Sequence, residues 1–130
     1  MDRSLSLAPM LVLLCACAAS GGATLQQVQS ACASGASHAE IEDTGTIVRV
    51  LGTRTSDSGT HEGFIVRIGT TPVRFEDNTD ITGPIPLSRG EQIEFRGQYE
   101  CDDGVVHWTH HDPAMRHPAG YIRAGGRTYA

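Results

Sequence analysis

The sequence predicts a mainly β protein, a small closed or partly open antiparallel barrel of the OB type with one short N-terminal helix. The 130 residues leave room for one small domain, and the 15 glycines favour turns and short strands over a helical bundle. About five short stretches rich in β-branched or alternating apolar residues follow one another between turn residues. The pattern Gly-x-x-Ile-x-Phe-x-Gly at residues 90–97 suits such a barrel. An open β-sandwich is the alternative fold.

Residues 1–23 are predicted to be a secretory signal peptide. The apolar block from Ala8 to Ala19 is too short to span a bilayer but has the length of a signal's apolar region. Within it, Leu14-Cys15-Ala16-Cys17 resembles a bacterial lipobox, which predicts that Cys17 is lipidated and becomes the new N-terminus. Ordinary cleavage at one of the following alanines would instead remove both cysteines. We therefore expect an exported protein that is periplasmic, held at the membrane by its lipid, or secreted.

Residues 24–43 are predicted to form a short helix and a linker ahead of a barrel domain at residues 44–130. Leu25, Val28 and Cys32 recur at helical spacing, with Thr24 as the N-cap and Gly35 as the stop. Residues 34–43 are small and polar, which indicates a connection.

The two cysteines that follow the signal segment predict one disulfide. In an oxidising compartment Cys32 and Cys101 are expected to pair, which would tie the N-terminal segment to the barrel. The alternative is that Cys101 is a free, half-buried thiol.

The strands are predicted from β-branched residues and from alternation along the chain. Ile93, Phe95 and Tyr99 alternate with polar residues and should point inward, and Gly97 on the same face indicates a bulge or a sharp bend. Prolines and Asx residues predict a crossover loop at 76–88, and β-turn residues predict a loop at 52–59. The expected strands are residues 45–51, a hairpin of 64–68 with 73–75, residues 90–100, and a terminal hairpin or extended tail at 120–129.

The stretch Val105 to Pro113 is where chemistry is most expected. It contains His107, His110 and His111, three of the six histidines, together with the single tryptophan, Trp108. If residues 105–111 form a straight strand, His107 and His111 share one face but lie roughly 13 Å apart, too far to bind one metal ion.

A metal site would therefore need a bend or ligands from elsewhere. The available donors are His61, Asp80, His111 and His117, and such a set suits zinc or another divalent transition metal. Asn78 would join the same site, or would simply stabilise an Asx turn. The alternative for the whole cluster is structural: Trp108 fills the core and the histidines hydrogen-bond to backbone or to carboxylates.

Charge disfavours nucleic acid as a partner. The formal net charge is −5, all ten basic residues are arginines scattered among acidic residues, and aromatic residues are few. Tight binding to a phosphate backbone needs a basic stripe, and binding to single strands needs a platform of aromatic side chains.

Several motifs together resemble a bacterial protein family, domain of unknown function 3465. The resemblance covers residues 44 to 129 and is carried by His61–Arg67, Asp77–Asp80, Gly97–Glu100, Val106–Pro113 and Gly120–Ile122, above all by the run His-Trp-Thr-His-His-Asp-Pro. The chain departs from the family pattern, which has glutamine, histidine, isoleucine and two tryptophans at these places, in Glu62, Asp77, Thr79, Cys101 and Tyr121. The resemblance implies a small exported or envelope-associated domain and no particular activity.

Three functions are compatible with these observations. The first is a monomeric binding module that holds a small ligand, a glycan or a partner protein on a histidine-rich face of the barrel. The second is a metal-dependent hydrolase, of the phosphodiesterase or nuclease type, with His107, His110 and Asp112 as catalytic groups. The third is a structural lipoprotein that contacts the membrane only through a lipid on Cys17. The sequence leaves open whether the protein is an enzyme.

Overall fold

The computed structural model describes residues 22–130. Cys17 and all but the last two residues of the predicted signal segment lie outside the described residues. Within the described part of the chain, no helix has the length and apolar character needed to cross a membrane.

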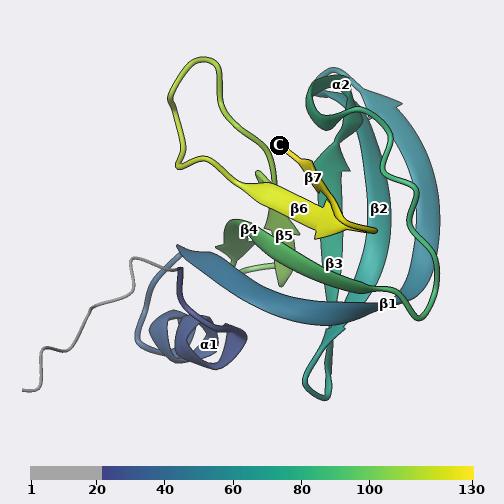
Figure 1. Ribbon diagram of the computed structural model, residues 1–130. Helices are drawn as coiled ribbons and strands as arrows, with labels where there is room; N and C mark the ends of the chain where they lie inside the picture. The colour runs from purple at the N-terminus through teal and green to yellow at the C-terminus, as the bar shows by residue number, and fades with distance from the viewer. Residues whose placement is uncertain (1–21) are drawn as a thin grey trace, which may run out of the picture.

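Between residues 22 and 130, seven strands and two short helices follow one another (Figure 1). They are α1 (Leu25–Ala33), β1 (His38–Ser56), β2 (Gly59–Ile68), β3 (Thr71–Asn78), α2 (Thr79–Thr82), β4 (Gln92–Glu100), β5 (Val105–His107), β6 (Tyr121–Ala124) and β7 (Arg127–Tyr129).

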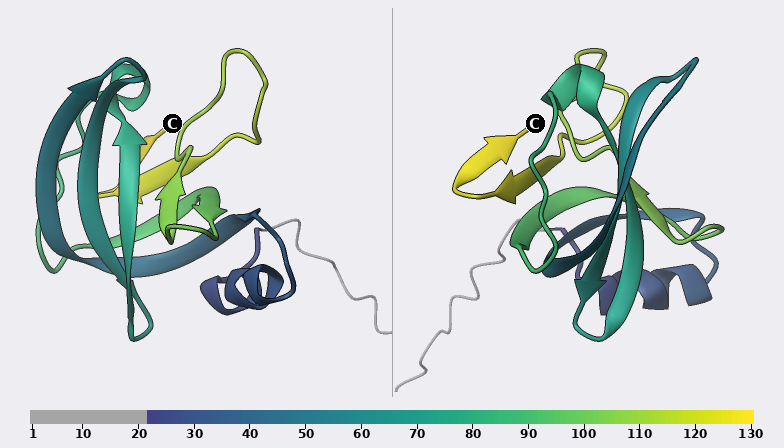
Figure 2. Two further views of the ribbon diagram at one scale, coloured as in Figure 1. Left: turned by 180° about the vertical axis from the view of Figure 1, so that it is seen from behind. Right: turned by 90° about the vertical axis from the view of Figure 1, so that its right-hand side faces the viewer.

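The strands curl into a partly closed barrel of the OB type, as predicted. The order in the sheet is β1-β2-β3-β5-β4-β6-β7, and β1 also pairs with β4, so that five strands form a ring. Among these seven strands, only β3 and β5 pair in parallel, and every other pair of neighbouring strands is antiparallel. Two further views show β1 curving past both β4 and β2 (Figure 2). The β6–β7 hairpin extends the sheet from β4, which confirms the predicted terminal hairpin.

Apolar side chains fill the interior of the ring. Phe75 lies between Phe64 and Phe95, with ring centroids 5.3 and 4.7 Å away, and all three are fully buried. Because aromatic side chains bury large apolar areas, this trio makes up much of the core. The other apolar side chains that are at most 2% exposed are Val28, Ile41, Ile47, Val66, Ile85, Ile93, Val106 and Ile122.

The predicted N-terminal helix is confirmed and packs against the barrel. Thr24 and Gln27 form a capping box at its start, and Leu25 and Val28 are buried in the core. Gly35 has φ +102°, which suits a glycine just after a helix end. The disulfide between Cys32 and Cys101 joins this helix to the end of β4, as predicted.

Three predicted connections are strand in the structure. β1 begins at His38 and continues to Ser56, so the linker predicted at 34–43 and the loop predicted at 52–59 both contain strand. β-bulges between Ile47 and Arg49 and between Val50 and Gly52 bend this long strand. β3 likewise extends through Asn78 into the predicted crossover loop. These segments have polar outer faces, so their composition resembles that of loops.

A bulge or a sharp bend was predicted at Gly97, but the structure gives this glycine a different role. The pairing of β4 with β1 runs without a register shift, and a Cβ on Gly97 would lie 2.7 Å from the carbonyl oxygen of His107. The glycine therefore allows β5 to approach β4 closely.

The straight strand considered for residues 105–111 is not formed. β5 ends at His107, and Trp108 has φ +57°, which is rare for a residue with a side chain. The chain then forms a long loop, residues 108–120, which we call the histidine loop. Because β5 ends at His107, His111 lies in this loop and does not share a strand face with His107.

Candidate functional site

A groove of about 530 Å³ lies on the outer face of β2, β3 and β5. It is flanked by the end of β1 with the β1–β2 turn on one side and by the β4–β5 turn on the other. The lining residues are Arg54, Ser56, Ser58, His61, Arg74, Glu76, Asp103, Val105 and His107. We call this surface the β2–β3 groove.

Strand alternation places these side chains outside the barrel. On β3, Val73 and Phe75 point into the core, so Arg74 and Glu76 point outward. On β5 the buried residue is Val106, which leaves its neighbour His107 on the outer face. His61 faces outward on β2 by the same rule, because Phe64 and Val66 point inward.

The polar groups of the groove carry both signs of charge. The guanidinium of Arg74 donates hydrogen bonds to the Glu76 carboxylate, with Nε 2.8 Å from Oε1. The imidazole Nδ1 of His61 lies 3.3 Å from the carbonyl oxygen of Gly59. His107 Nε2 lies 3.6 Å from Glu100 Oε1, beyond hydrogen-bond distance. The groove therefore combines arginine and carboxylate side chains with two imidazoles.

Asp77 fixes the histidine loop to the barrel from inside. Its side chain is fully buried and accepts hydrogen bonds from Thr109 Oγ1 at 2.6 Å and from Thr82 Oγ1 at 2.5 Å. Burial raises the pKa of Asp77, and the two hydroxyl donors only partly offset this effect. One carboxyl group thus joins β3, α2 and the first turn of the loop.

Asp112 organises the far part of the histidine loop. Burial alone would raise the pKa of Asp112, but the backbone N–H groups of Ala114 and Arg116, which donate to it, outweigh this and lower the pKa to about 2. The N–H of His117 also donates to Asp112, at 3.2 Å. A carboxylate that closes a turn in this way has a structural role.

The aromatic rings of the loop stack on one another. Trp108 and His117 lie face to face with ring centroids 4.5 Å apart, and His110 meets His117 edge-on at 5.1 Å. Nδ1 of His110 lies 2.6 Å from the carbonyl oxygen of His111, and Nδ1 of His117 lies 2.8 Å from that of Pro118. Trp108 remains 40% exposed, so it does not fill the core.

A known protein family matches most of this chain. A family described as protein of unknown function (DUF3465) matches residues 10–130. The chain belongs to this family. Searches of the curated proteins and of the solved structures found no match.

In this DUF3465 protein the four predicted metal ligands do not converge on one point: His61 and Asp80 lie near the β1–β2 turn, and His111 and His117 lie in the histidine loop. His61 lines the β2–β3 groove, and Asp80 accepts a hydrogen bond from the backbone N–H of Thr60 at 2.9 Å. His111 is exposed on the histidine loop, and His117 stacks on Trp108. Among residues 22–130 no three His, Cys, Asp or Glu side chains lie close enough together to hold one metal ion.

The predicted catalytic residues are divided between the β2–β3 groove and the histidine loop, where His110 and Asp112 both lie beside His117. His107 faces the groove, His110 is buried in the loop, and Asp112 binds loop backbone. Asn78 caps α2 by accepting a hydrogen bond from the N–H of Asp80 at 3.1 Å. This contact is the Asx turn that the sequence offered as the alternative to a ligand role for Asn78.

Sequence reasoning found the histidines of the groove but not its charged residues. Arg74 lies in a segment predicted as strand, and alternation with Val73 and Phe75 would have placed it on the outer face. Glu76 lay in a segment predicted as loop. Arg54 lies in a part of β1 that was predicted as loop, and Asp103 lies in the β4–β5 turn, so no periodic pattern was available to indicate their direction.

Proposed function

We propose that this DUF3465 domain is a binding module that holds a glycan across the β2–β3 groove. The observation that carries the proposal is the position of the groove. It lies on the β2–β3 face between the β1–β2 and β4–β5 turns, where OB barrels bind oligosaccharides and oligonucleotides. Because a fold alone does not give a function, the residues of the groove must supply the chemistry.

The lining chemistry favours a neutral, hydroxyl-rich ligand. Arg54 and Arg74 can donate hydrogen bonds, Glu76 and Asp103 can accept them, and the serine hydroxyls can do both. The two arginines and two carboxylates balance, so the groove offers no net charge to a polyanion when the histidines are neutral. A sugar chain presents alternating donors and acceptors without charge, which matches this lining.

An aromatic side chain lies next to the groove. The ring centroids of Trp108 and His107 are 6.4 Å apart, and 40% of Trp108 is exposed. A partly exposed tryptophan offers apolar contact area with little conformational entropy to lose, and such residues are enriched at binding surfaces. It would contact the apolar face of a sugar ring at the end of the groove.

Hydrolysis is a weaker interpretation of the same histidines. A metal-dependent mechanism needs several ligands around one point, and the described residues bring no such group together. Three histidines, His61, His110 and His117, each have a ring nitrogen next to a backbone carbonyl oxygen. These contacts orient the rings without a bound ion.

The proposal includes export of the domain. The Cys32–Cys101 disulfide supports this part, because disulfides persist in oxidising compartments. A lipid on Cys17 would then hold the module at the envelope, close to glycan ligands.

The test is the affinity for a soluble glycan. The probe is a hexamer of β-1,4-linked N-acetylglucosamine, whose binding is measured by isothermal titration calorimetry. Arg54→Ala with Arg74→Ala should weaken binding about tenfold or more, because it removes both guanidinium donors from the groove. Arg89→Ala, an exposed arginine outside the groove, is the control and should leave affinity unchanged. Absence of hexamer binding, or equal binding by all three proteins, would overturn the proposal.

A further inference from the structure

The β2–β3 groove continues into a smaller pocket of about 150 Å³ on the outer face of β1 and β2. The two share four lining residues, and the smaller pocket adds Leu51, Gly52, Thr53 and Gly63. We call it the glycine pocket, because two glycines open it. A ligand that lies along the groove would therefore meet this pocket as well.

The two glycines face each other across β1 and β2. Gly52 pairs with Gly63, and Gly63 lies on the outer face because its neighbour Phe64 points into the core. Gly52 has φ +89°, a conformation that favours glycine, and nothing lies within 4 Å of the place its Cβ would take. Paired side chains normally cover the face of a sheet, so this pair leaves a dent.

A leucine and a carboxylate lie on either strand beside Gly63. A Cβ on Gly63 would lie 3.4 Å from Leu51 Cβ and 3.6 Å from both carboxylate oxygens of Glu76. Leu51 is the additional residue of the β-bulge between Val50 and Gly52, and it remains 40% exposed. The pocket therefore offers an apolar contact close to a hydrogen-bond acceptor.

The polar groups of the pocket are only partly used within the protein. Arg74 donates both of its hydrogen bonds to one oxygen of Glu76, Oε1. Among residues 22–130 no group donates to Glu76 Oε2, and Arg54 forms no ion pair. One acceptor and one guanidinium group are thus available to a ligand.

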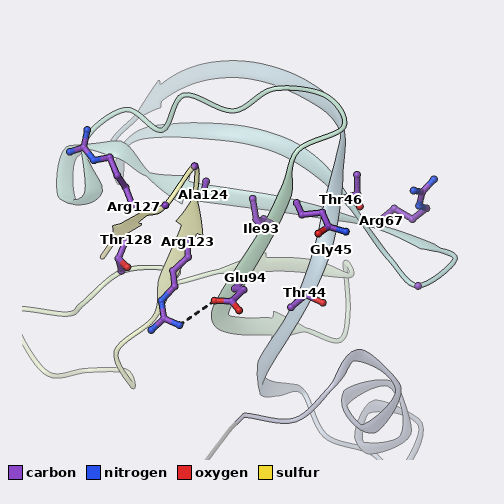
Figure 3. A pocket seen from close by; sticks show the side chains of 14 residues that line it. Thr44, Gly45, Thr46, Arg67, Ile93, Glu94, Arg123, Ala124, Arg127 and Thr128 are labelled. Carbon is purple, nitrogen blue, oxygen red and sulfur yellow. Dashed lines mark hydrogen bonds and ion pairs between the residues drawn. The ribbon is translucent and has the colours of Figure 1, made fainter.

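A second large pocket, of about 600 Å³, lies between β1, β4 and the β6–β7 hairpin (Figure 3). Figure 3 shows Arg67 and Arg127 at its two ends, with their guanidinium groups turned away from each other. None of the large apolar side chains that residues 22–130 expose lines this pocket. The β2–β3 groove, by contrast, has Leu51 in the glycine pocket and Trp108 beside His107.

We propose that the glycine pocket binds the acetamido group of an N-acetylated amino sugar, so that the groove selects glycans of this class. The inference rests on the proposed glycan function and adds the substrate class to it.

An acetamido group carries three features that the lining matches. Its methyl group contacts Leu51, its N–H donates to Glu76 Oε2, and its carbonyl oxygen accepts from Arg54. A hydroxyl group at the same sugar carbon is too small to make these contacts together and leaves Leu51 in water. The absence of a side chain at Gly63 provides the space for the amide.

The experiment compares two glycans that differ only in this group. They are the N-acetylglucosamine hexamer and the β-1,4-linked glucose hexamer, each titrated into the protein by calorimetry. Wild type should bind the N-acetylated hexamer about tenfold more tightly, because the glucose hexamer leaves the polar groups of the pocket unpaired.

Two variants change the pocket and keep both arginines of the groove. Gly63→Val fills it, at a strand position that suits valine, and should abolish the preference. Leu51→Ala removes the apolar contact and should reduce the preference to about threefold or less. Both should bind the glucose hexamer within about twofold of wild type. The matched control is Val50→Ala, because Val50 is 42% exposed but does not line the pocket, and this variant should keep the full preference.

The results separate this inference from the glycan function itself. Equal affinity of wild type for the two hexamers, or a preference that Leu51→Ala leaves intact, would overturn the role of the pocket and leave the groove as a glycan site. Binding of neither hexamer would overturn both proposals. Thermal unfolding checks that each variant is folded, and the exposed Leu51→Ala variant carries the test if Gly63→Val does not fold.

Discussion

At the scale of single residues, Asp77 has the most unusual environment. A carboxyl group that is fully buried is rare unless it is paired, and this one is held by two hydroxyl donors without a cationic partner within hydrogen-bond distance among residues 22–130. Glu62, its cross-strand neighbour on β2, also has a pKa raised by burial. The interior at this end of the barrel therefore favours protonated carboxyl groups.

This environment predicts a pH-dependent stability. Because the pKa of folded Asp77 lies above its ordinary value of 3.8, the folded state binds the proton more tightly than the unfolded state does. The contribution of Asp77 to stability is full below that value and is lost as pH rises through the raised pKa. Asp77→Asn should match wild type within about 1 kcal/mol at pH 3 and become the more stable of the two as pH rises.

Urea unfolding at several pH values measures this difference. Asp57→Asn, at an exposed turn position, is the control and should show no such trend. A difference between Asp77→Asn and wild type that stays constant from pH 3 to pH 8 would contradict the account of this residue.

At the scale of elements, local patterns predicted the strands better than their ends. The alternation of Ile93 and Phe95 predicted β4, and the helical spacing that begins at Leu25, with Thr24 as N-cap, predicted α1. Both signals are contained in a few neighbouring residues. β1 was predicted too short, since its ends expose a polar face. The end of β5 before Trp108 could not be predicted. It depends on the hydrogen bond from Thr109 to Asp77, which lies on β3, far away in the sequence.

Among the contacts that join one element to another, the disulfide is expected to contribute most to stability. It links Cys32 of α1 with Cys101 across a sequence separation of 69 residues. Loop-closure entropy for a loop of this length gives about 4 kcal/mol, an upper figure for most proteins. Replacing both cysteines with alanine should lower the free energy of unfolding by 2–4 kcal/mol, about the usual range for a native bridge.

Chemical denaturation of oxidised, reduced and double-alanine proteins tests this value. The reduced protein and the double variant should agree with each other. Equal denaturation midpoints for all three proteins would show that the bridge adds nothing to stability.

At the scale of the whole molecule, the glycine content and the succession of short strand patterns were enough to predict the barrel, but not the site. The β2–β3 groove draws side chains from β1, β2, β3, β5 and two turns. A strand pattern predicts which face a residue lies on, as it does for His107, but not which residues of other strands lie beside it.

The most direct test of the central claim is to map the bound glycan on the wild-type protein. Backbone amide shifts are recorded by nuclear magnetic resonance during titration with the N-acetylglucosamine hexamer. Glycan binding in the β2–β3 groove predicts that the largest shifts fall at residues 54–61, 74–76 and 103–108, with the β6–β7 hairpin unaffected. Shifts centred elsewhere, or no shifts at saturating hexamer, would contradict the assignment of the groove as a glycan site.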